Sequence, residues 1–214
     1  MGKKRSFFWE SLAPKKLWYL VGLITSDGCL SKDGRHIDIT AKEQDFLHLL
    51  RSEMEFKCSV AKKMNGQGQQ SFRVQISSKS FHQFLQEKGL TPNKSKTIRK
   101  IEVPEEHFGH FLRGVMDGDG CIRNWQDHAK RISQWYCKIT SGSQAFLGWI
   151  DQRLREVYAI KGSIHLEHYG ESSAYILKIS SKYSLKKFLG LCYENAEFAL
   201  SRKRAQALQC LQSL

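Results

Sequence analysis

The stretch "FLRGVMDGDGCI" at residues 111–122 places Asp117 and Asp119 among three glycines, directly after an apolar run. A second stretch, "YLVGLITSDGCL" at residues 19–30, aligns with it position for position at an offset of 92 residues. Acidic residues beside glycine are typical of a turn at the end of a helix. Because the arrangement occurs twice, the question is whether these carboxylates only end two helices or also hold a ligand.

The similarity continues downstream of both stretches in the same order. "IDITAKEQDFL" (37–47) resembles "CKITSGSQAFL" (137–147), and "FRVQISSKSFHQFL" (72–85) resembles "YILKISSKYSLKKFL" (175–189). Three matches in one order indicate an internal duplication. The sequence therefore predicts two related halves, with boundaries at residues 1–100 and 101–214.

Each half has the same predicted succession of elements. A helix ends at the Asp-Gly pair, and two short segments with alternating apolar and polar residues follow, as strands do. A helix, two more strands and a last helix complete the half. The sequence thus predicts an α+β protein built from two αββαββα units. The second pair of strands in each half is predicted near residues 57–64 and 71–77 in the first half, and near residues 162–168 and 174–180 in the second.

The charge of the chain points to a polyanionic partner. Thirty-four Lys and Arg against 21 Asp and Glu give a formal net charge of +13, with a sequence pI near 9.5. This balance is typical of nucleic-acid-binding proteins. A basic protein that is merely soluble, or that docks on an anionic membrane, is the alternative.

The six cysteines form no CxxC pair, so they are interpreted as small core residues of a reduced protein. We see neither an apolar signal-peptide core nor 18 uninterrupted apolar residues. These features predict an intracellular, non-secreted protein. The aromatic residues Phe7, Phe8, Trp9 and Trp18 are expected to pack beside the first helix rather than to stack on bases.

Small residues four apart recur in both motifs, as Gly22 with Ser26 and Gly114 with Gly118. This spacing lets two helix backbones approach closely. If the two motif helices pack together, Asp27 and Asp119 meet at their C-terminal ends, where two carboxylates repel each other and require cations. Oxygen ligands of this kind suit Mg²⁺. The alternative is that each Asp-Gly only caps a helix.

The segments "LVGLITSDG" (20–28) and "LRGVMDGDG" (112–120) resemble the two signature helices of the single-chain LAGLIDADG homing endonucleases. The resemblance covers nearly the whole chain. It implies a pseudo-twofold pair of units whose antiparallel sheets form a DNA-binding saddle, with the motif helices packed at the centre. It also implies a monomer, encoded within an intron or a similar mobile element. Such an enzyme hydrolyses both strands of a long DNA site with Mg²⁺ and leaves 3′ overhangs, and Mn²⁺ or Ca²⁺ can substitute in binding.

The resemblance assigns roles to residues of both motifs. Asp27 and Asp119 correspond to the metal ligands, and the carbonyls of Ser26 and Gly118 to further metal ligands. Asp117 fills an earlier, structural position of the motif, where the first half has Thr25.

The basic residues near the metal are less regular. A Gln that often follows the second strand is replaced by Ala41 and Ser141. The repeat suggests Lys94 as a catalytic lysine, with Ser201 as its counterpart in the second half. Plain phosphate contact or a solvated surface is the alternative for the basic residues there, which are Lys94, Lys96, Arg202 and Lys203.

Alternation within the strands separates an inner from an outer face. Phe72, Val74 and Ile76 are expected to face the core, which leaves Arg73 and Gln75 on the other side. A polar outer face can hydrogen-bond base edges, although a solvated sheet face is polar in any case. The two halves carry unlike faces, which predicts an asymmetric, non-palindromic target. The predicted DNA-binding residues are His36, Asp38, Thr40, Lys42, Lys63, Arg73, Gln75, Arg123, Tyr136, Lys138, His165, Glu167 and Lys178.

Two alternatives from other classes stay open. The first is a non-cleaving nucleic-acid binder on the same fold, either a maturase that assists splicing of its own intron RNA or a transcription factor. The second is a basic structural protein without chemistry, which leaves the paired motifs unexplained. The presence of both motif acids favours the nuclease.

Overall fold

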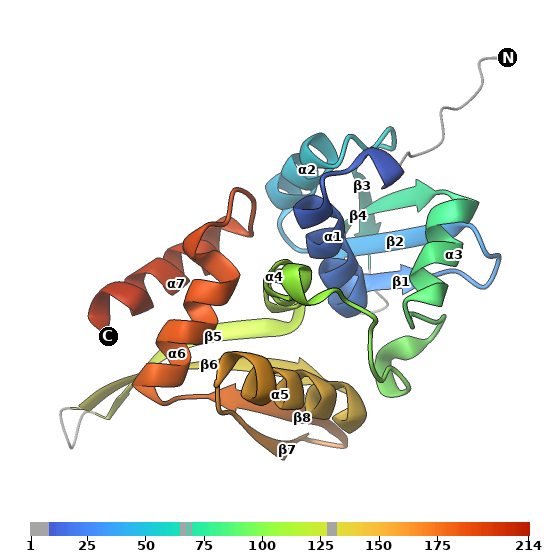
Figure 1. The fold of residues 1–214 in the computed structure, drawn as a ribbon. Coiled ribbons are helices and arrows are strands. Elements are labelled where there is room, and N and C mark those ends of the chain that lie inside the picture. Colours follow the sequence, from blue (N-terminus) through green and yellow to red (C-terminus); the bar gives the residue numbers. More distant parts are fainter. Residues whose placement is uncertain (1–8, 65–67, 69, 128–131) are drawn as a thin grey trace, which may run out of the picture. The chain divides into compact units, whose positions relative to one another are not determined.

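The computed structural model describes residues 9–64, 68, 70–127 and 132–214 (Figure 1). The chain forms two compact units. Unit 1 comprises Met1–Lys94 with Ile101–Gly114, and unit 2 comprises Ser95–Lys100 with Val115–Leu214. Each unit thus includes a short segment from the other side of residue 100, and the boundary at residues 100 and 101 stays a prediction.

Unit 1 is built on a four-stranded antiparallel sheet in the order β1-β2-β4-β3. Helices precede, separate and follow its two hairpins, as the sequence predicts. Its elements are α1 (Pro14–Asp27), β1 (Gly28–Leu30), β2 (His36–Ala41), α2 (Gln44–Glu53), β3 (Ala61–Met64), β4 (Gln70–Ser77) and α3 (Lys79–Glu87).

Unit 2 repeats this topology with a four-stranded antiparallel sheet in the order β5-β6-β8-β7. Helix α4 (Phe108–Asp119) leads into it, and its first seven residues belong to unit 1. The other elements are β5 (Gly120–Asp127), β6 (Ile132–Ser141), α5 (Gln144–Tyr158), β7 (Ser163–Tyr169), β8 (Ser172–Ile179), α6 (Lys182–Leu189), a π-helical turn (Gly190–Glu194) and α7 (Ser201–Ser213). The predicted α+β class and the two αββαββα units are confirmed.

The first motif helix, α1, is buried on all sides. Pro14 starts the helix, where its missing N–H costs no hydrogen bond. Every residue from Trp18 to Thr25 is buried, because the segment is apolar all round the helix rather than along one stripe. Helix α1 therefore forms the core of unit 1 and carries its last residue, Asp27, to the surface.

Within unit 1, α4 approaches α1 closely at Gly114. A Cβ atom added to Gly114 would lie 2.2 Å from the carbonyl oxygen of Tyr19 and 2.6 Å from the amide nitrogen of Leu23. Any side chain there would overlap the α1 backbone. The predicted close approach of two helix backbones is thus confirmed at this glycine.

The described aromatic residues of the N-terminal region, Trp9 and Trp18, are packed as expected, but the aromatic rings that they contact belong to α3 rather than to the first helix. The rings of Trp9 and Phe84 stack with their centroids 4.2 Å apart, and Trp18 lies 6.2 Å from the same phenylalanine ring. Phe7 and Phe8 lie outside the described residues.

The cysteines correspond only partly to the predicted core residues. Cys137, Cys192 and Cys210 are buried, and burial raises the pKa of Cys137 well above its usual range and that of Cys210 to about 11. The thiols of Cys137 and Cys210 therefore remain protonated at neutral pH. The prediction is wrong for Cys29, which is exposed because β1 pairs it with Asp38 on the outer face of the sheet. In the part of the chain that the structure describes, the helices are too short or too polar to cross a membrane.

Candidate metal site and nucleic-acid interface

The two motif acids occupy equivalent positions in their own units. Asp27 is the last residue of α1 and Asp119 the last residue of α4, and both are exposed. The residues before them, Ser26 and Gly118, are half-buried. Each carboxylate therefore stands at the C-terminal end of a helix, where the helix dipole makes the local potential more negative and favours a bound cation.

Asp117 has a different role from Asp119, although only one residue separates them. Its side chain is buried and accepts a 2.8 Å hydrogen bond from the Tyr193 hydroxyl and a 2.7 Å bond from the Leu200 amide. In α1 the corresponding Thr25 is buried and donates back to the carbonyl of Val21 at 2.7 Å. The interpretation of this motif position as structural is confirmed.

The end of α4 is held by a buried lysine for which the sequence suggested only phosphate contact or a solvated surface. Lys203, on α7, donates from its Nζ to the carbonyls of Met116, Asp117 and Gly118 at 2.6, 2.7 and 3.0 Å. The last carbonyls of a helix have no partners within the helix, so a cation beside them satisfies both their hydrogen bonds and the dipole. The Gly118 carbonyl retains one lone pair for a further partner.

Lys94 does the same in unit 1. It is buried, and its Nζ donates to the carbonyl of Gly28, just beyond the end of α1, at 2.5 Å. The corresponding buried lysine of unit 2 is Lys203, which matches the repeat when its alignment is shifted by two residues from Ser201. Ser201 is the exposed first residue of α7. The sequence offered one signal for Lys203: it lies two residues after Ser201, the position that the repeat aligns with Lys94.

We expect Lys203→Met to lower the free energy of unfolding by about 1–3 kcal/mol, because it leaves buried carbonyls at the end of α4 without a donor. Urea unfolding measures this. The matched control is Arg204→Met on an exposed neighbouring position, which should change stability by less than about 0.5 kcal/mol. Equal stability of the two variants would show that the three hydrogen bonds contribute nothing.

Apart from Lys42, which follows β2, the predicted DNA-binding residues lie on one face of each sheet. In unit 1, Asp38 pairs with Gln75 and Thr40 with Arg73, and in unit 2 Lys138 pairs with Lys178. The alternate residues, such as Ile39 and Val74, are fully buried. The predicted division into an inner and an outer face is therefore confirmed, although Ile176, which lies on the same face as Lys178 by strand alternation, has no exposed surface.

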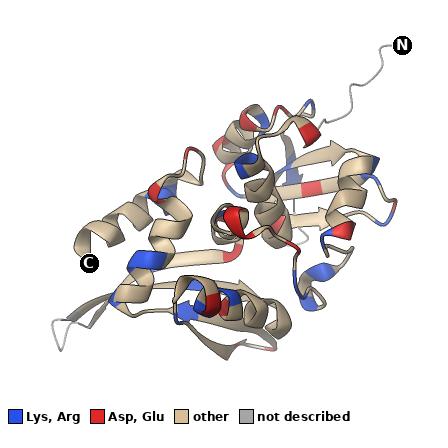
Figure 2. Ribbon diagram, viewed as in Figure 1, with Lys and Arg blue, Asp and Glu red and all other residues tan. Residues whose placement is uncertain are grey.

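The exposure of the outer-face residues varies. Those with exposed side chains are Lys42, Lys63, Gln75, Arg123 and His165. Those that are half-buried are His36, Asp38, Thr40, Arg73, Tyr136, Lys138, Glu167 and Lys178. Lys and Arg are also spread over helices and strands of both units, so charge alone does not mark the interface (Figure 2).

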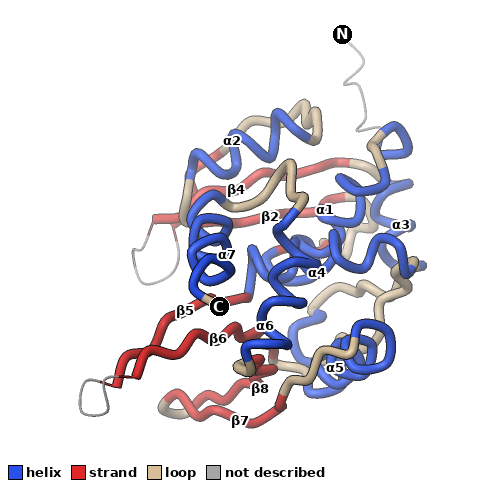
Figure 3. Tube along the Cα trace, turned by 60° about the vertical axis from the view of Figure 1, so that its left-hand side comes forward, coloured by secondary structure: helices blue, strands red, loops and turns tan. Residues whose placement is uncertain are grey.

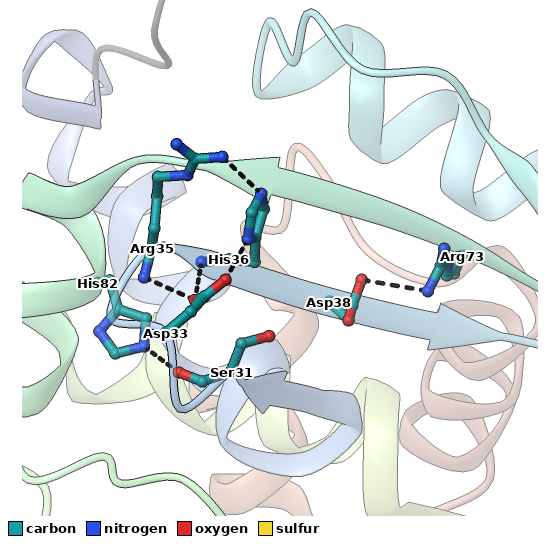
Figure 4. A network of polar contacts seen from close by, with 7 residues as sticks. All are labelled: Ser31, Asp33, Arg35, His36, Asp38, Arg73 and His82. Atoms are coloured by element: carbon teal, nitrogen blue, oxygen red, sulfur yellow. Dashed lines mark hydrogen bonds and ion pairs between the residues drawn. The ribbon is translucent and has the colours of Figure 1, made fainter.

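The turn between β1 and β2 is held by one carboxylate (Figure 4). Asp33 accepts hydrogen bonds from the amides of Arg35 and His36 at 2.9 and 3.0 Å, and its other oxygen lies 2.5 Å from Nδ1 of His36. The bond with His36 holds the pKa of Asp33 well below its usual range. Nε2 of His36 lies 3.4 Å from the Arg35 guanidinium, which can only donate, so the proton belongs on Nδ1. The imidazole is thereby fixed in one orientation and one tautomer.

Two further contacts in Figure 4 support this region. Nε2 of His82, on α3, lies 2.9 Å from the Ser31 carbonyl and anchors the start of the turn. Arg73 lies 3.9 Å from the carboxylate of Asp38 across the outer face. Because this ion pair is long and partly exposed, both side chains can exchange it for contacts with a ligand at little cost.

On the outer face of unit 2, Glu167 gathers three donors. It accepts from the Tyr169 hydroxyl and contacts His165 Nε2 at 3.2 Å and Lys138 Nζ at 3.3 Å. These hydrogen bonds, that of Tyr169 foremost, lower the pKa of Glu167 to about 2. Burial is the largest single influence on Lys138 and acts to lower its pKa, but the hydrogen bond and charge of Glu167, together with the charges of Tyr169 and Tyr136, outweigh burial and raise the pKa of the lysine. The contacts place two predicted DNA-binding residues, Lys138 and His165, around one carboxylate.

We expect the contribution of this cluster to the free energy of unfolding to depend on pH. Since the pKa of Glu167 is depressed in the folded state, the contribution is complete above its ordinary value of 4.5 and is lost as pH falls through about 2. The free-energy difference between the wild type and Glu167→Gln should therefore be present at pH 6 and absent near pH 2. Tyr169→Phe, which removes the main donor, should shift this loss toward pH 4.5. A difference independent of pH would contradict the assignment.

The donors at the motif ends suit a hard cation, because carboxylate and carbonyl oxygens are the ligands that Mg²⁺ and Ca²⁺ prefer. Within each unit, the available donors are one motif carboxylate and the carbonyls beside it. Among the described residues no group of three or more His, Cys, Asp or Glu side chains forms a metal-binding cluster.

The sequence matches no protein-family profile and no curated protein. The fold, in contrast, is that of the LAGLIDADG homing endonucleases of the single-chain, two-domain kind, and such solved structures match about nine-tenths of the chain.

Three solved structures illustrate the likeness. I-WcaI, a homing endonuclease bound to its DNA recognition sequence, is 15% identical and covers 97% of this chain and 94% of its own, with a TM-score of 0.64. Mesophilic variants of I-DmoI are 20% identical and cover 92% of this chain and 97% of their own, with a TM-score of 0.58. DUF199/WhiA from Thermatoga maritima is 16% identical and covers 98% of this chain and 67% of its own, with a TM-score of 0.60. At these identities the likeness establishes the fold alone.

Proposed function

We propose that the protein is a site-specific double-stranded DNA endonuclease of the homing type. The observation that carries the proposal is the duplicated motif acid: Asp27 and Asp119 are both exposed last residues of equivalent helices. The fold supports it, since solved structures with this fold include endonucleases bound to DNA. A net charge of +13 agrees with a DNA ligand.

In this proposal the residues that hold divalent metal are Asp27 and Asp119, with the carbonyls of Ser26 and Gly118. A bound Mg²⁺ supplies Lewis-acid stabilisation and an activated water for phosphodiester hydrolysis. Similar I-DmoI structures were solved with Ca and with Mn, which agrees with Mn²⁺ or Ca²⁺ replacing Mg²⁺ in binding. Lys94 and Lys203 act as positioning residues, because each ammonium fixes the helix end that presents an acid.

The outer faces of the two sheets are proposed to contact the major groove, where base edges offer the most distinct pattern. Their residues differ at matching positions: Asp38 and Gln75 in unit 1 correspond to Lys138 and Lys178 in unit 2. The target is therefore asymmetric, and cleavage of both strands leaves 3′ overhangs. We further propose a monomer that acts inside the cell and is encoded by an intron or a similar mobile element.

The second candidate is a non-cleaving binder, and one observation favours it. WhiA shares the fold and is not described as an endonuclease, so the fold does not decide between cleavage and binding. An RNA maturase acting on its own intron belongs to the same alternative. The retention of both acids at exposed helix ends favours the nuclease, because binding a polyanion gains nothing from carboxylates.

The test uses a duplex formed by joining the sequences that flank the gene's genomic insertion point. The purified protein is incubated with it in Mg²⁺, in Ca²⁺ and in EDTA. We expect cleavage of both strands in Mg²⁺ and none in EDTA. Tight binding without cleavage in either Mg²⁺ or Mn²⁺ would favour the non-cleaving candidate, and splicing of the intron RNA without DNA cleavage would identify a maturase.

A further inference from the structure

A two-stranded ribbon extends the sheet of unit 2. β5 and β6 pair through eight registers, from Gly120 with Ile139 to Asp127 with Ile132. β8, in contrast, pairs with β6 only over residues 137–141. Residues 123–127 and 132–136 therefore continue as a ribbon beyond the four-stranded sheet, as the views in Figures 1 and 3 agree.

Unit 1 carries a much shorter hairpin at the same place. β1 and β2 pair through three registers, which end at Leu30 with Ile37. One more backbone bond, from the Ser31 amide to the His36 carbonyl, closes the turn that Asp33 holds. In the part of unit 1 that the structure describes, the ribbon has no equivalent, so the two halves differ in the length of their sheets.

One face of the ribbon continues the outer face of the sheet. Alternation along β5 and β6 places Arg123, Trp125, Gln134 and Tyr136 on the side of Lys138. The ring of Tyr136 lies 4.8 Å beneath the ammonium of Lys178, which joins the ribbon to the face proposed to bind DNA. The described side chains of this ribbon face are basic, amide or aromatic.

The ribbon has exposed surface that its own unit does not cover. The exposed fraction of Trp125 is 51%, and Arg123, Gln126 and Gln134 are also exposed. On the opposite side Ser133 donates to the Asn124 side chain at 2.6 Å, so that face is polar too. A ribbon of two strands has no core of its own and gains little from folding by itself. An aromatic ring standing out from such a ribbon is expected to have a ligand.

We propose that this ribbon enters the major groove and lengthens the DNA contact of unit 2, so that the two halves of the target differ in length. The proposal rests on the proposed function. A two-stranded ribbon has the width that the major groove admits, and Arg123 and Gln134 carry groups that bind guanine and adenine edges. Five residues at about 3.3 Å each span roughly 16 Å, or between four and five base pairs at about 3.4 Å per step. Of the described side chains on this face, those of Trp125 and Gln134 lie farthest from the sheet, and they contact the outer pairs of this span.

The experiment compares the wild type with Trp125→Ala/Gln134→Ala. The matched control is Tyr183→Ala, which removes another aromatic ring, 63% exposed, from helix α6. Each protein is footprinted on the target duplex, and its affinity is measured for duplexes shortened by four base pairs at either end. Thermal unfolding verifies that all three proteins are folded.

We expect the wild-type footprint to be longer on the unit 2 side by about four base pairs. Shortening that end should weaken wild-type binding roughly tenfold or more and leave the double variant almost unaffected. Tyr183→Ala should behave as the wild type. Equal footprints on both sides, or a double variant that still responds to the shortening, would overturn the ribbon proposal while leaving the proposed function intact. A wild type that protects no duplex would overturn both.

Discussion

Asp119→Asn should lose cleavage of both strands by at least about a hundredfold while retaining DNA binding. The change replaces a charged metal ligand by a neutral amide of the same size, and even residues that only support a ligand typically contribute 10–100-fold. Binding is retained because removing a negative charge near phosphates reduces repulsion. Asp119 is exposed at the end of α4, so the substitution leaves the packing of unit 2 unchanged.

The experiment measures single-turnover cleavage and equilibrium binding on the same duplex. Asp27→Asn should reproduce the loss, because Asp27 holds the equivalent position in unit 1. The matched control is Asp45→Asn, which neutralises an exposed carboxylate in the first turn of α2. It should cleave at the wild-type rate. Normal cleavage by Asp119→Asn would remove the basis of the metal assignment.

Gly114→Ala should destabilise the protein by about 1–3 kcal/mol or more, the range found when atoms are forced into a well-packed interior. The new methyl group would lie 2.2 Å from the carbonyl of Tyr19 and 2.6 Å from the amide of Leu23. Both obstacles are backbone atoms of a buried helix, so neither can rotate away. The helices must separate, which opens the core of unit 1.

Gly148→Ala is the matched control. Gly148 lies in α5, and no atom outside its immediate surroundings approaches within 4 Å of an added Cβ. Alanine favours a helix over glycine by up to about 1 kcal/mol, so this variant should be as stable as the wild type or slightly more stable. Melting temperatures of the two variants should therefore shift in opposite directions. If both fell equally, the loss would reflect glycine replacement in general rather than the helix contact.

The fold could be predicted because its determinants are local and occur twice. The repeat around Asp27 and Asp119 located both motif helices, and the alternation in "FRVQIS" placed Val74 inward and Gln75 outward, as the register confirms. Such patterns depend on the periodicity of single elements. The duplication also showed which acid of "DGDG" has an acidic counterpart in the first half. Asp119 aligns with Asp27, whereas Asp117 aligns with Thr25, so the two acids could be given different roles.

The features that sequence reasoning missed depend on contacts between distant residues. Lys203 reaches carbonyls 85 to 87 residues away, and no local pattern distinguishes it from a solvated lysine. The cluster around Glu167 joins Lys138 across the sheet, 29 residues away. The length of the β5–β6 ribbon depends on where β8 stops pairing, which the composition of β5 does not reveal.

The contacts of the two buried lysines also have a consequence for biosynthesis. The bond from Lys94 to Gly28 spans 66 residues and lies within the first half of the chain, so it can form while synthesis continues. The bonds of Lys203 to the end of α4 require α7, which leaves the ribosome 85 to 87 residues later than the carbonyls that it binds. We expect ribosome-bound chains stalled before residue 200 to leave the end of α4 open to proteolysis. In the proposed nuclease, the helix end that carries Asp119 is then fixed only once α7 has emerged and folded, which would keep half-made enzyme from cutting the host chromosome.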